Sequence, residues 1–505
     1  MALTVDMRKI PDWMGRMTGS GRDRHKRVAE TFPQSDDCGT ATMVFGGLWL
    51  LLSATTFLVA GPWAGFHAIL LGGLGLLILL RPARVPLPAV WWGLAIAFVI
   101  AGAAAFLPAR WFHEPEWRSQ LESLGVATGS LVVIQSRLAA ESFALFVLTL
   151  FSGLWMAGHR PSAAQLRLWA LMFTLGVACY ALIARLAQDS PHLANTFRGQ
   201  HFGFFPNRNH SATYLSMGAI CGLGCVLQAL RDKRFVVLAI AFAATAICLW
   251  AIASWSISRA GVVLVAIGCL LWVSMLGRRY LGRHGLWAIA LIVITAVGLF
   301  FTANTAVRER LSLTVEKAGT IIDSERISES ASGKSVLASG RNIDFRLPVF
   351  RDTLGLIRDF PWTGIGAGQF YYIFPQYRHE TIVVNDSDGY HPESDWLWMA
   401  SETGVPATLL LLVLLGLAAW KSLRGIQLGR DRALRAACLT AALLVPIHGF
   451  FDVPGHRISL ALSAIRVPTL GRGVVRGMPC RGRRGVLVSG GFCAFCLRRA
   501  SGCGR

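Results

Sequence analysis

The fold is decided by residues 234–276, which read RFVVLAIAFAATAICLWAIASWSISRAGVVLVAIGCLLWVSML. After Arg234, the only charged side chain in this stretch of sequence is Arg259. A helix needs about 20 mostly apolar residues to cross a bilayer, so the stretch predicts two membrane spans, 234–255 and 259–276, joined by a tight hairpin. A chain that contains such a segment is expected to be an integral membrane protein.

Apolar runs of the same kind recur along the 505 residues, of which 54% are hydrophobic and 15% are charged. They lie at 42–60, 62–80, 88–107, 141–158, 165–187, 211–230, 234–255, 259–276, 285–303, 405–420 and 434–450, and a last run starts at 458. That last run ends after about eight residues, which is too short to cross. The sequence therefore predicts an all-α, polytopic transmembrane helix bundle of about 12 spans, the last one incomplete.

The basic residues indicate the direction of the spans, because Lys and Arg are enriched in cytoplasmic loops. They precede the first span and then recur in every second loop. They are Arg8, Lys9, Arg16, Arg22, Arg24, Lys26 and Arg27, then Arg81 and Arg84, Arg160 and Arg167, Arg231, Lys233 and Arg234, Arg278, Arg279 and Arg283, and finally Lys421, Arg424, Arg430, Arg432 and Arg435.

This alternation places the N-terminal segment 1–41 in the cytoplasm. The first nine spans then occupy 42–303, a large extracytoplasmic loop occupies 304–404, and the remaining spans occupy 405–464. The shorter loops near 108–140, 188–210, 256–259 and 451–457 lie on the same side as the large loop.

The net charge of +21 would suggest nucleic-acid binding in a soluble protein. The basic residues follow the membrane pattern instead, and the sequence contains no nucleic-acid-binding module. Part of the charge comes from the tail 465–505, which holds nine Arg, nine Gly and four Cys and no Asp, Glu or Lys. Because this tail interrupts the last span, we expect it to be a frame-shifted reading of GC-rich DNA. Its Cys493 and Cys496 form a CxxC without a second pair, so no zinc or redox site is predicted.

The large loop contains two predicted helices. The first is amphipathic, rests on the bilayer surface and ends at Pro361. Its apolar positions are Ile343, Leu347, Phe350, Leu354 and Ile357. The second is predicted to start at His391-Pro-Glu-Ser-Asp395, because proline at the first position and acids in the first turn are helix-start signals, and to end at Gly404. His391 would be its N-cap.

Several patterns in the loop fail the requirements of known motifs. Ser332-Gly-Lys-Ser335 lacks the first glycine of a P-loop at 328, and His379-Glu380 lacks the second histidine of a zinc protease at 383. Gly364-Ile-Gly-Ala-Gly368 follows a helix instead of a strand, so it does not predict a dinucleotide site. No cluster of His, Cys and carboxylates has metal spacing. We therefore predict neither a metal nor another cofactor.

The remaining candidates are cations and a histidine at extracytoplasmic span ends. Arg208 and His210 precede the sixth span, and Arg259 lies in the tight hairpin. An arginine this close to hydrocarbon is costly unless it is paired or meets an anion, but it could equally snorkel to a lipid phosphate; both interpretations are open. His391 is either a plain N-cap or a neutral base beside an anion at a helix N-terminus.

The order of these motifs resembles the O-antigen ligase and O-antigen polymerase superfamily over about residues 190–455. The motifs are Phe205-Pro-Asn-Arg-Asn-His210, Ser258-Arg-Ala-Gly261, Ser339-Gly-Arg341, Pro361-Trp-Thr-Gly-Ile-Gly-Ala-Gly368, His391 and Glu402-Thr-Gly404. Family members often have Asn after the loop histidine, where this chain has Pro392.

The resemblance implies a membrane glycosyltransferase with a GT-C-like bundle in the bacterial inner membrane, facing the periplasm. Such enzymes move a glycan from undecaprenyl diphosphate to an acceptor hydroxyl, with inversion and without a metal. By motif match, Arg208, Arg259 and Arg341 would bind the diphosphate and His391 would be the base. Asn209, His210 and Glu402 would support them.

The acceptor stays open among lipid A core, a growing polysaccharide and protein Ser or Thr. We favour the O-antigen ligase-like activity in lipopolysaccharide biosynthesis over an O-antigen or exopolysaccharide polymerase and a protein O-oligosaccharyltransferase. A polysaccharide transporter or flippase ranks lower, because paired interrupted helices and mid-membrane charges are missing from the pattern. A structural scaffold would leave the ordered Arg and His set without a purpose.

Sidedness can be tested with Tyr390→Cys, which introduces a thiol next to His391. We expect a membrane-impermeant thiol reagent to label Cys at 390 from the extracytoplasmic side, since the alternation of basic loops places 304–404 there. The unmodified chain, with its native cysteines, gives the background. Labelling restricted to the cytosolic side would reverse the predicted topology.

Overall fold

The computed structural model describes residues 72–76, 78–80, 87–112, 116–125, 130–131, 136–158, 163–189, 202–205, 207–277, 346–378, 391–427, 431–457, 460, 461 and 464. These residues form helices and no strand, apart from an isolated antiparallel bridge between Pro108 and Ser130. The all-α prediction is therefore confirmed for the described part of the chain.

The long helices coincide with the predicted spans. They are α4 (Ala89–Gly102) with η2 (Ala103–Phe106), α6 (Ser136–Ala157), α7 (Ala163–Asp189), α9 (Arg208–Arg231), α10 (Phe235–Trp250) with the π-turn η4 (Ala251–Ser256), α11 (Arg259–Leu276), α18 (Asp395–Gln427) and α19 (Arg432–His448). Seven of the described helices are long and apolar enough to cross a membrane, and α19 is slightly shorter, with 17 residues.

Several predicted spans lie outside the described residues. These are 42–60, most of 62–80, 285–303 and most of the run from 458. The total of about 12 spans therefore stays a prediction.

The described long helices form two groups. In the first, α9 is surrounded by α7, α10, α11 and α19 and is buried along most of its length. Small residues let its neighbours approach closely, as in other membrane bundles. A Cβ on Gly218 would come within 2.6 Å of Val177 on α7, and one on Gly222 would collide with Thr245 on α10. A Cβ on Gly224 would collide with Ala437 on α19. Successive glycines of α9 thus each accommodate a different helix.

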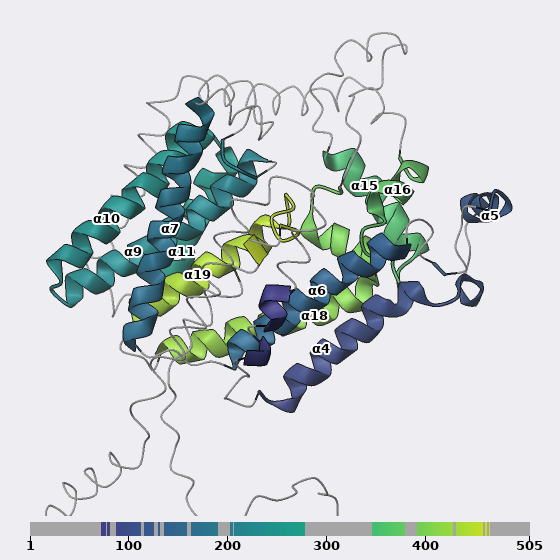
Figure 1. Cartoon of the computed structure of the whole chain (residues 1–505), viewed down its shortest axis with the longest axis horizontal. Helices are drawn as coiled ribbons and strands as arrows, with labels where there is room; N and C mark the ends of the chain where they lie inside the picture. Colours follow the sequence, from purple (N-terminus) through teal and green to yellow (C-terminus); the bar gives the residue numbers. More distant parts are fainter. Residues whose placement is uncertain are drawn as a thin grey trace, which may run out of the picture.

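The remaining long helices form a second group beside the first (Figure 1). In it, α18 packs against α4 and touches α19, so α19 connects the two groups. Apolar side chains cover the outside of both groups; Phe235 on α10 and Leu270 on α11, for example, are 72% and 71% exposed. Such surfaces are expected of helices that face lipid, because lipid tails are as apolar as the side chains.

One end of the first group gathers loops that were predicted to be cytoplasmic. The Arg167 guanidinium at the start of α7 lies 3.1 Å from Asp232 after α9 and 2.6 Å from Asp431 before α19. The Trp272 indole on α11 donates to the Ala433 carbonyl over 2.9 Å. The predicted extracytoplasmic segments 207–210 and 256–259 lie at the opposite ends of the same helices, as the alternation of basic loops requires.

The first predicted loop helix is present as α15 (Arg346–Asp359). Its buried face is formed by Val349, Thr353 and Leu356, whereas Leu347 and Leu354 of the predicted apolar stripe are 68% and 55% exposed. The helix therefore packs on the protein with one face and presents apolar side chains on the other. This arrangement supports the predicted position at the bilayer surface.

The Pro361–Gly368 and Glu402–Gly404 motifs form one joint between α15 and α18. The Ile365 and Gly366 amides donate to the carbonyls of Ser401 and Glu402 over 2.9 Å each. Gly364 and Gly404 have φ values of 63° and 82°, in the region that favours glycine. Gly404 is non-helical and separates the first part of α18 from its span, as predicted.

This joint predicts a stability difference between two Gly→Ala substitutions. At Gly364 an alanine would be strained by its positive φ and would collide with the Glu402 carbonyl group, so we expect Gly364→Ala to destabilise the protein by about 1–3 kcal/mol or more. The control is Gly355→Ala on α15, whose Cβ would lie 3.8 Å from Tyr377 and should be tolerated. Thermal melting of the purified protein measures both, and equal melting temperatures would contradict the joint.

Candidate functional site

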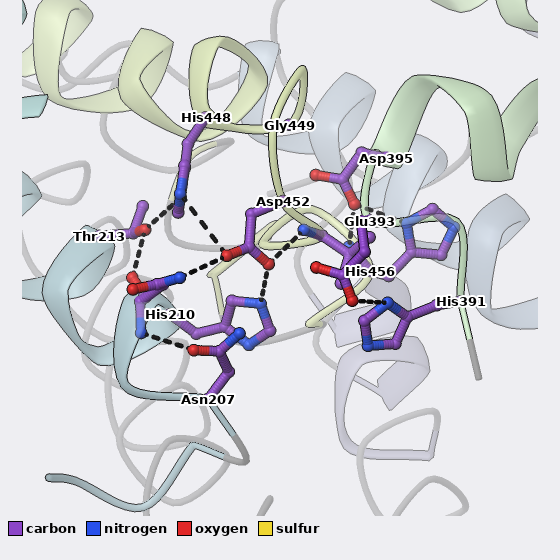
Figure 2. A network of polar contacts seen from close by, with 12 residues as sticks. Asn207, His210, Thr213, His391, Glu393, Asp395, His448, Gly449, Asp452 and His456 are labelled. Atoms are coloured by element: carbon purple, nitrogen blue, oxygen red, sulfur yellow. Dashed lines mark hydrogen bonds and ion pairs between the residues drawn. The ribbon is translucent and has the colours of Figure 1, made fainter. Parts of the chain in front are cut away.

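A polar network lies where the starts of α9 and α11 meet the segments 391–395 and 449–457 (Figure 2). The four segments are far apart in sequence. They meet because α19 runs antiparallel to α9, which brings the residues after His448 next to Asn209 and His210. This network contains several of the residues singled out from the sequence.

Asp452 lies at the centre of the network and is fully buried. Its Oδ1 lies 3.0 Å from His210 Nε2, and its Oδ2 accepts a 2.9 Å hydrogen bond from the side-chain Nδ2 of Asn209. His448 Nε2 and an Arg346 nitrogen lie 3.8 and 3.9 Å from Oδ2. The carboxylate therefore ties α9, α15 and α19 together.

The surroundings of Asp452 favour its charged form. Burial alone would raise the pKa of the carboxyl, but its contacts with His210, His448 and Asn209 hold the pKa well below its usual range. A buried carboxylate with this many donors is a fixed negative charge within the network.

Asn209 also links the two helix starts that carry the predicted arginines. Its side-chain oxygen accepts a 2.9 Å hydrogen bond from Ser258 Oγ, and Ser258 is the N-cap of α11, accepting from the Gly261 amide over 3.2 Å. The Asn207 side chain caps α9 by accepting a 2.9 Å hydrogen bond from the backbone amide of Asn209. The starts of α9 and α11 are thus held side by side.

Arg208 and Arg259 are the first residues of α9 and α11. Arg208 is half-buried and Arg259 is exposed. A cation at a helix N-terminus is unfavourable for the helix, because the N-terminus carries partial positive charge. Two such positions beside a shared hydrogen bond form a positive region that suits an anion.

His391 does not cap a helix, so that prediction is wrong. Helix α18 begins at Asp395, because Glu393 has a left-handed backbone (φ 53°) that interrupts the helical path. The Asp395 amide donates instead to the Gly449 carbonyl over 2.8 Å. The proposed effect of a helix N-terminus on His391 therefore does not apply.

His391 is held by Glu393 and Trp398. Its Nδ1 is buried 3.1 Å from Glu393 Oε1, without the alignment of a hydrogen bond. The imidazole stacks on Trp398 with ring centres 5.6 Å apart. Glu393 Oε2 lies 3.4 Å from Arg346 Nε, which connects the His391 segment to Asp452 through one arginine.

A second carboxylate and histidine pair anchors this segment. Asp395 accepts from His456 Nδ1 over 2.6 Å and from the Gly455 amide over 2.7 Å. The His456 ring stacks on Trp398 at 4.0 Å. Trp398 thus contacts both His391 and His456, and the start of α18 is fixed to the segment after α19.

The predicted site residues fall into three groups. Asn209, His210 and His391 belong to the network, and Arg208 and Arg259 adjoin it. Glu402 lies in the glycine joint, where it is buried and accepts from the Phe370 amide over 3.2 Å; its supporting role stays a prediction. Arg341 lies outside the described residues.

Sequence analysis missed Asp452, Arg346 and Glu393 as site residues. A signal existed for Asp452, since an acid in the short predicted loop 451–457 between two apolar runs needs a partner. Arg346 and Glu393 had no such signal, because their pairing joins α15 to a segment that follows more than 40 residues later. Among the described residues, no group of three or more His, Cys, Asp or Glu could hold a metal ion.

Comparison with known families agrees with the motif order. Residues 243–412 match the family model described as O-antigen ligase. This match confirms the resemblance to the O-antigen ligase superfamily, and together with the apolar helices it identifies a multi-pass membrane protein. It includes α11, α15 and the His391 segment, and it ends before α19. No curated protein matches the chain.

The role of Asp452 can be tested with Asp452→Asn. This change removes a buried charge and replaces one of the two carboxylate oxygens with an NH2 donor, so that either His210 or Asn209 loses its acceptor. We therefore expect a loss of about 3 kcal/mol and a lower melting temperature at neutral pH. Because the pKa of Asp452 is depressed in the folded protein, the difference from wild type should shrink as pH falls below about 4.

Asp359→Asn is the matched control for this experiment. Asp359 is exposed and accepts one hydrogen bond from Tyr377, of 2.7 Å, so its substitution should cost about 1 kcal/mol or less. Equal stability of Asp452→Asn and wild type would contradict the role of Asp452 as the centre of the network.

Proposed function

We propose that this protein is a glycosyltransferase that moves a glycan from undecaprenyl diphosphate to an acceptor hydroxyl at the extracytoplasmic face of the inner membrane. The observation that carries the proposal is the continuous polar network from the starts of α9 and α11 to His391. It joins a positive region suited to a diphosphate to a histidine suited to proton transfer. The match of residues 243–412 to O-antigen ligases supports the same chemistry.

In the proposed reaction, the acceptor oxygen attacks the anomeric carbon of the glycan. The bond between that carbon and the diphosphate oxygen breaks, and its electron pair leaves with the diphosphate. Arg208 and Arg259 stabilise the charge that develops there, since guanidinium groups donate paired, permanently charged hydrogen bonds to phosphate oxygens. By resemblance, Arg341 is a further diphosphate ligand.

His391 takes the proton of the acceptor hydroxyl in this scheme. Its Nδ1 faces Glu393 and is buried, so Nε2 is the nitrogen that would meet the acceptor. The side chain keeps 21% exposure, which leaves it accessible. Attack from the side opposite the leaving diphosphate would invert the anomeric centre, and none of these steps uses a metal.

The acceptor stays open among lipid A core, a second glycan and a protein hydroxyl. We favour ligation, because the chain has the long late loop with a histidine near its end, and because the matched family is described as O-antigen ligase. A polymerase or a protein oligosaccharyltransferase would use the same donor site with a different acceptor.

The proposed function predicts that His391→Ala lowers transfer from undecaprenyl-diphosphate glycan by about 10²–10⁴-fold, the usual contribution of a general base. Purified protein is incubated with this donor and, in parallel, with lipid A core, free glycan and a Ser/Thr peptide, and the product is quantified by mass spectrometry. Turnover that is unchanged in the folded variant would remove His391 from the mechanism. Movement of the lipid-linked glycan across vesicles without transfer would favour a flippase.

The diphosphate site predicts that Arg208→Ala and Arg259→Ala each lower transfer by about 10²-fold or more. Arg259→Lys should be intermediate, since lysine keeps the charge but loses the planar fork. Arg231→Ala is the matched control, because Arg231 ends the same helix that Arg208 starts. Equal activities of the Arg208 and Arg231 variants would contradict the assignment.

A further inference from the structure

Glu393 occupies an unusual position for a glutamate. Its backbone is left-handed (φ 53°), a conformation that costs a non-glycine residue about 1–2 kcal/mol. Its side chain is 10% exposed, although buried carboxylates require compensation. Strained residues of this kind persist when the surrounding structure holds them, and they concentrate at functional sites.

The two carboxylate oxygens of Glu393 face two different partners. Oε1 lies 3.1 Å from His391 Nδ1, and Oε2 lies 3.4 Å from Arg346 Nε. The left-handed backbone turns the side chain back toward His391, only two residues earlier. Arg346 on α15 fixes the other oxygen, and its own terminal nitrogen lies 3.9 Å from Asp452.

This geometry favours a proton on one of the two ring nitrogens of His391. A carboxylate facing Nδ1 favours the tautomer with the proton on Nδ1, which leaves the Nε2 lone pair free to accept one. The negative charge also stabilises the imidazolium that forms when Nε2 takes up a proton. Both effects are those of a carboxylate that orients a histidine base.

We propose that Glu393 is the positioning residue for His391, and that Arg346 holds Glu393 in place and tunes the basicity of the histidine. The role of this arrangement in catalysis rests on the proposed function. The Arg346–Glu393–His391 arrangement itself can be tested without turnover.

The titratable and charged groups of the network that includes His391 come from several elements. They are Glu393 and Asp395 on its own segment, Arg346 on α15, Asp452, His456 and Arg457 on the segment after α19, His210 on α9 and His448 on α19. Of these, Glu393 lies within ion-pair distance of His391. Asp395 pairs instead with His456, which stacks on Trp398. Removal of the Glu393 charge should therefore have the largest effect on the protonation of His391.

Substitutions of Glu393 and of Arg346 should have opposite effects on the protonation of His391. Glu393→Gln removes a negative charge 3.1 Å from His391, so the variant should be protonated at His391 only at a lower pH than wild type. Arg346→Gln removes a positive charge from the far side of Glu393, so protonation should shift to higher pH. Glu393→Asp keeps the charge and should stay closer to wild type than Glu393→Gln, which separates the charge effect from a packing defect.

The first measurement is carbethoxylation of His391 by diethyl pyrocarbonate in the purified full-length chain, followed by mass spectrometry from pH 5 to 9, a window chosen around the ordinary histidine pKa of about 6.5. The reagent modifies the neutral imidazole, so the midpoint of reactivity reports protonation of His391 without any substrate. Glu122→Gln and Arg351→Gln are the matched controls; both residues are exposed, and Arg351 lies on the same helix as Arg346. Opposite shifts in the two test variants, with both controls unshifted, support the proposal, and unshifted midpoints in both test variants overturn it.

The second measurement is the pH dependence of transfer from undecaprenyl-diphosphate glycan, with the acceptor that gives turnover. The acid limb of the kcat/KM profile should move in the same directions as the reactivity midpoints, and Glu393→Gln should lower kcat by at least about 10-fold. If Glu393→Gln abolishes turnover at every pH, the carboxylate is itself the base and the positioning role is overturned. If wild type gives no transfer while the reactivity midpoints shift as stated, the proposed function fails and the arrangement stands.

Discussion

The buried carboxylate of Asp452 is the interaction on which the rest of the site depends. A charge removed from water is costly unless it is paired and hydrogen-bonded, and loss of one partner from such a pair typically costs about 3–5 kcal/mol. Here the partners come from α9, α15 and α19. The carboxylate therefore makes the position of each of these elements depend on the other two. The segment 449–457 gains its own order from the same source, because the Val453 amide also donates to Asp452.

The close packing of α9 makes this arrangement possible. Its glycines let α7, α10 and α19 approach to contact distance, and Gly261 near the start of α11 similarly meets Ala212 on α9. With the helix axes fixed in this way, the polar residues at one end of α9 have defined distances to those on α11 and α19. In a membrane bundle, small residues and interhelical hydrogen bonds replace the hydrophobic driving force that acts in water. The network at this end and the Arg167 cluster at the other follow the same principle.

Much of the fold could be predicted from the sequence, because its signals are local. The runs 234–255 and 259–276 became α10 with η4 and α11 almost to the residue, since about 20 apolar residues have few alternatives to a spanning helix. The predicted break at Gly404 is present for an equally local reason, its positive φ. The start of α18 was misplaced because Pro392 and the acids gave start signals, whereas the contact of Asp395 with Gly449 decides where the helix begins. That contact joins distant segments and leaves no trace in the local pattern.

The site residues also divide into those with a local sequence signal and those whose role depends on distant contacts. Arg208 and Arg259 could be singled out because each stands at the edge of an apolar run, where a polar residue needs an explanation. His391 stood out through the predicted helix start and the motif resemblance. The Arg346–Glu393 pair could not, because these two residues lie more than 40 residues apart in sequence. Asp452 carried a signal, as an acid in a short loop between two apolar runs, but its partners on α9 and α15 lie far away in sequence. The Glu402 and Gly364 motifs illustrate the converse case. They were prominent in sequence, and their geometry makes them the two halves of one backbone joint, so a conspicuous motif can have a clear role in the fold.

The distribution of charge gives the site a direction. The starts of α9 and α11 each carry an arginine where the helix itself disfavours a cation, whereas the His391 segment carries the carboxylate of Glu393. Asp452 lies between the two sides, bonded to Asn209 and His210 and close to Arg346. A diphosphate would be attracted to the first side and repelled from the second. In the proposed reaction this separation keeps the leaving group away from the base, which inversion requires, because the acceptor must approach from the face opposite the diphosphate. Arg346 lies within 4 Å of both carboxylates and limits the repulsion between them.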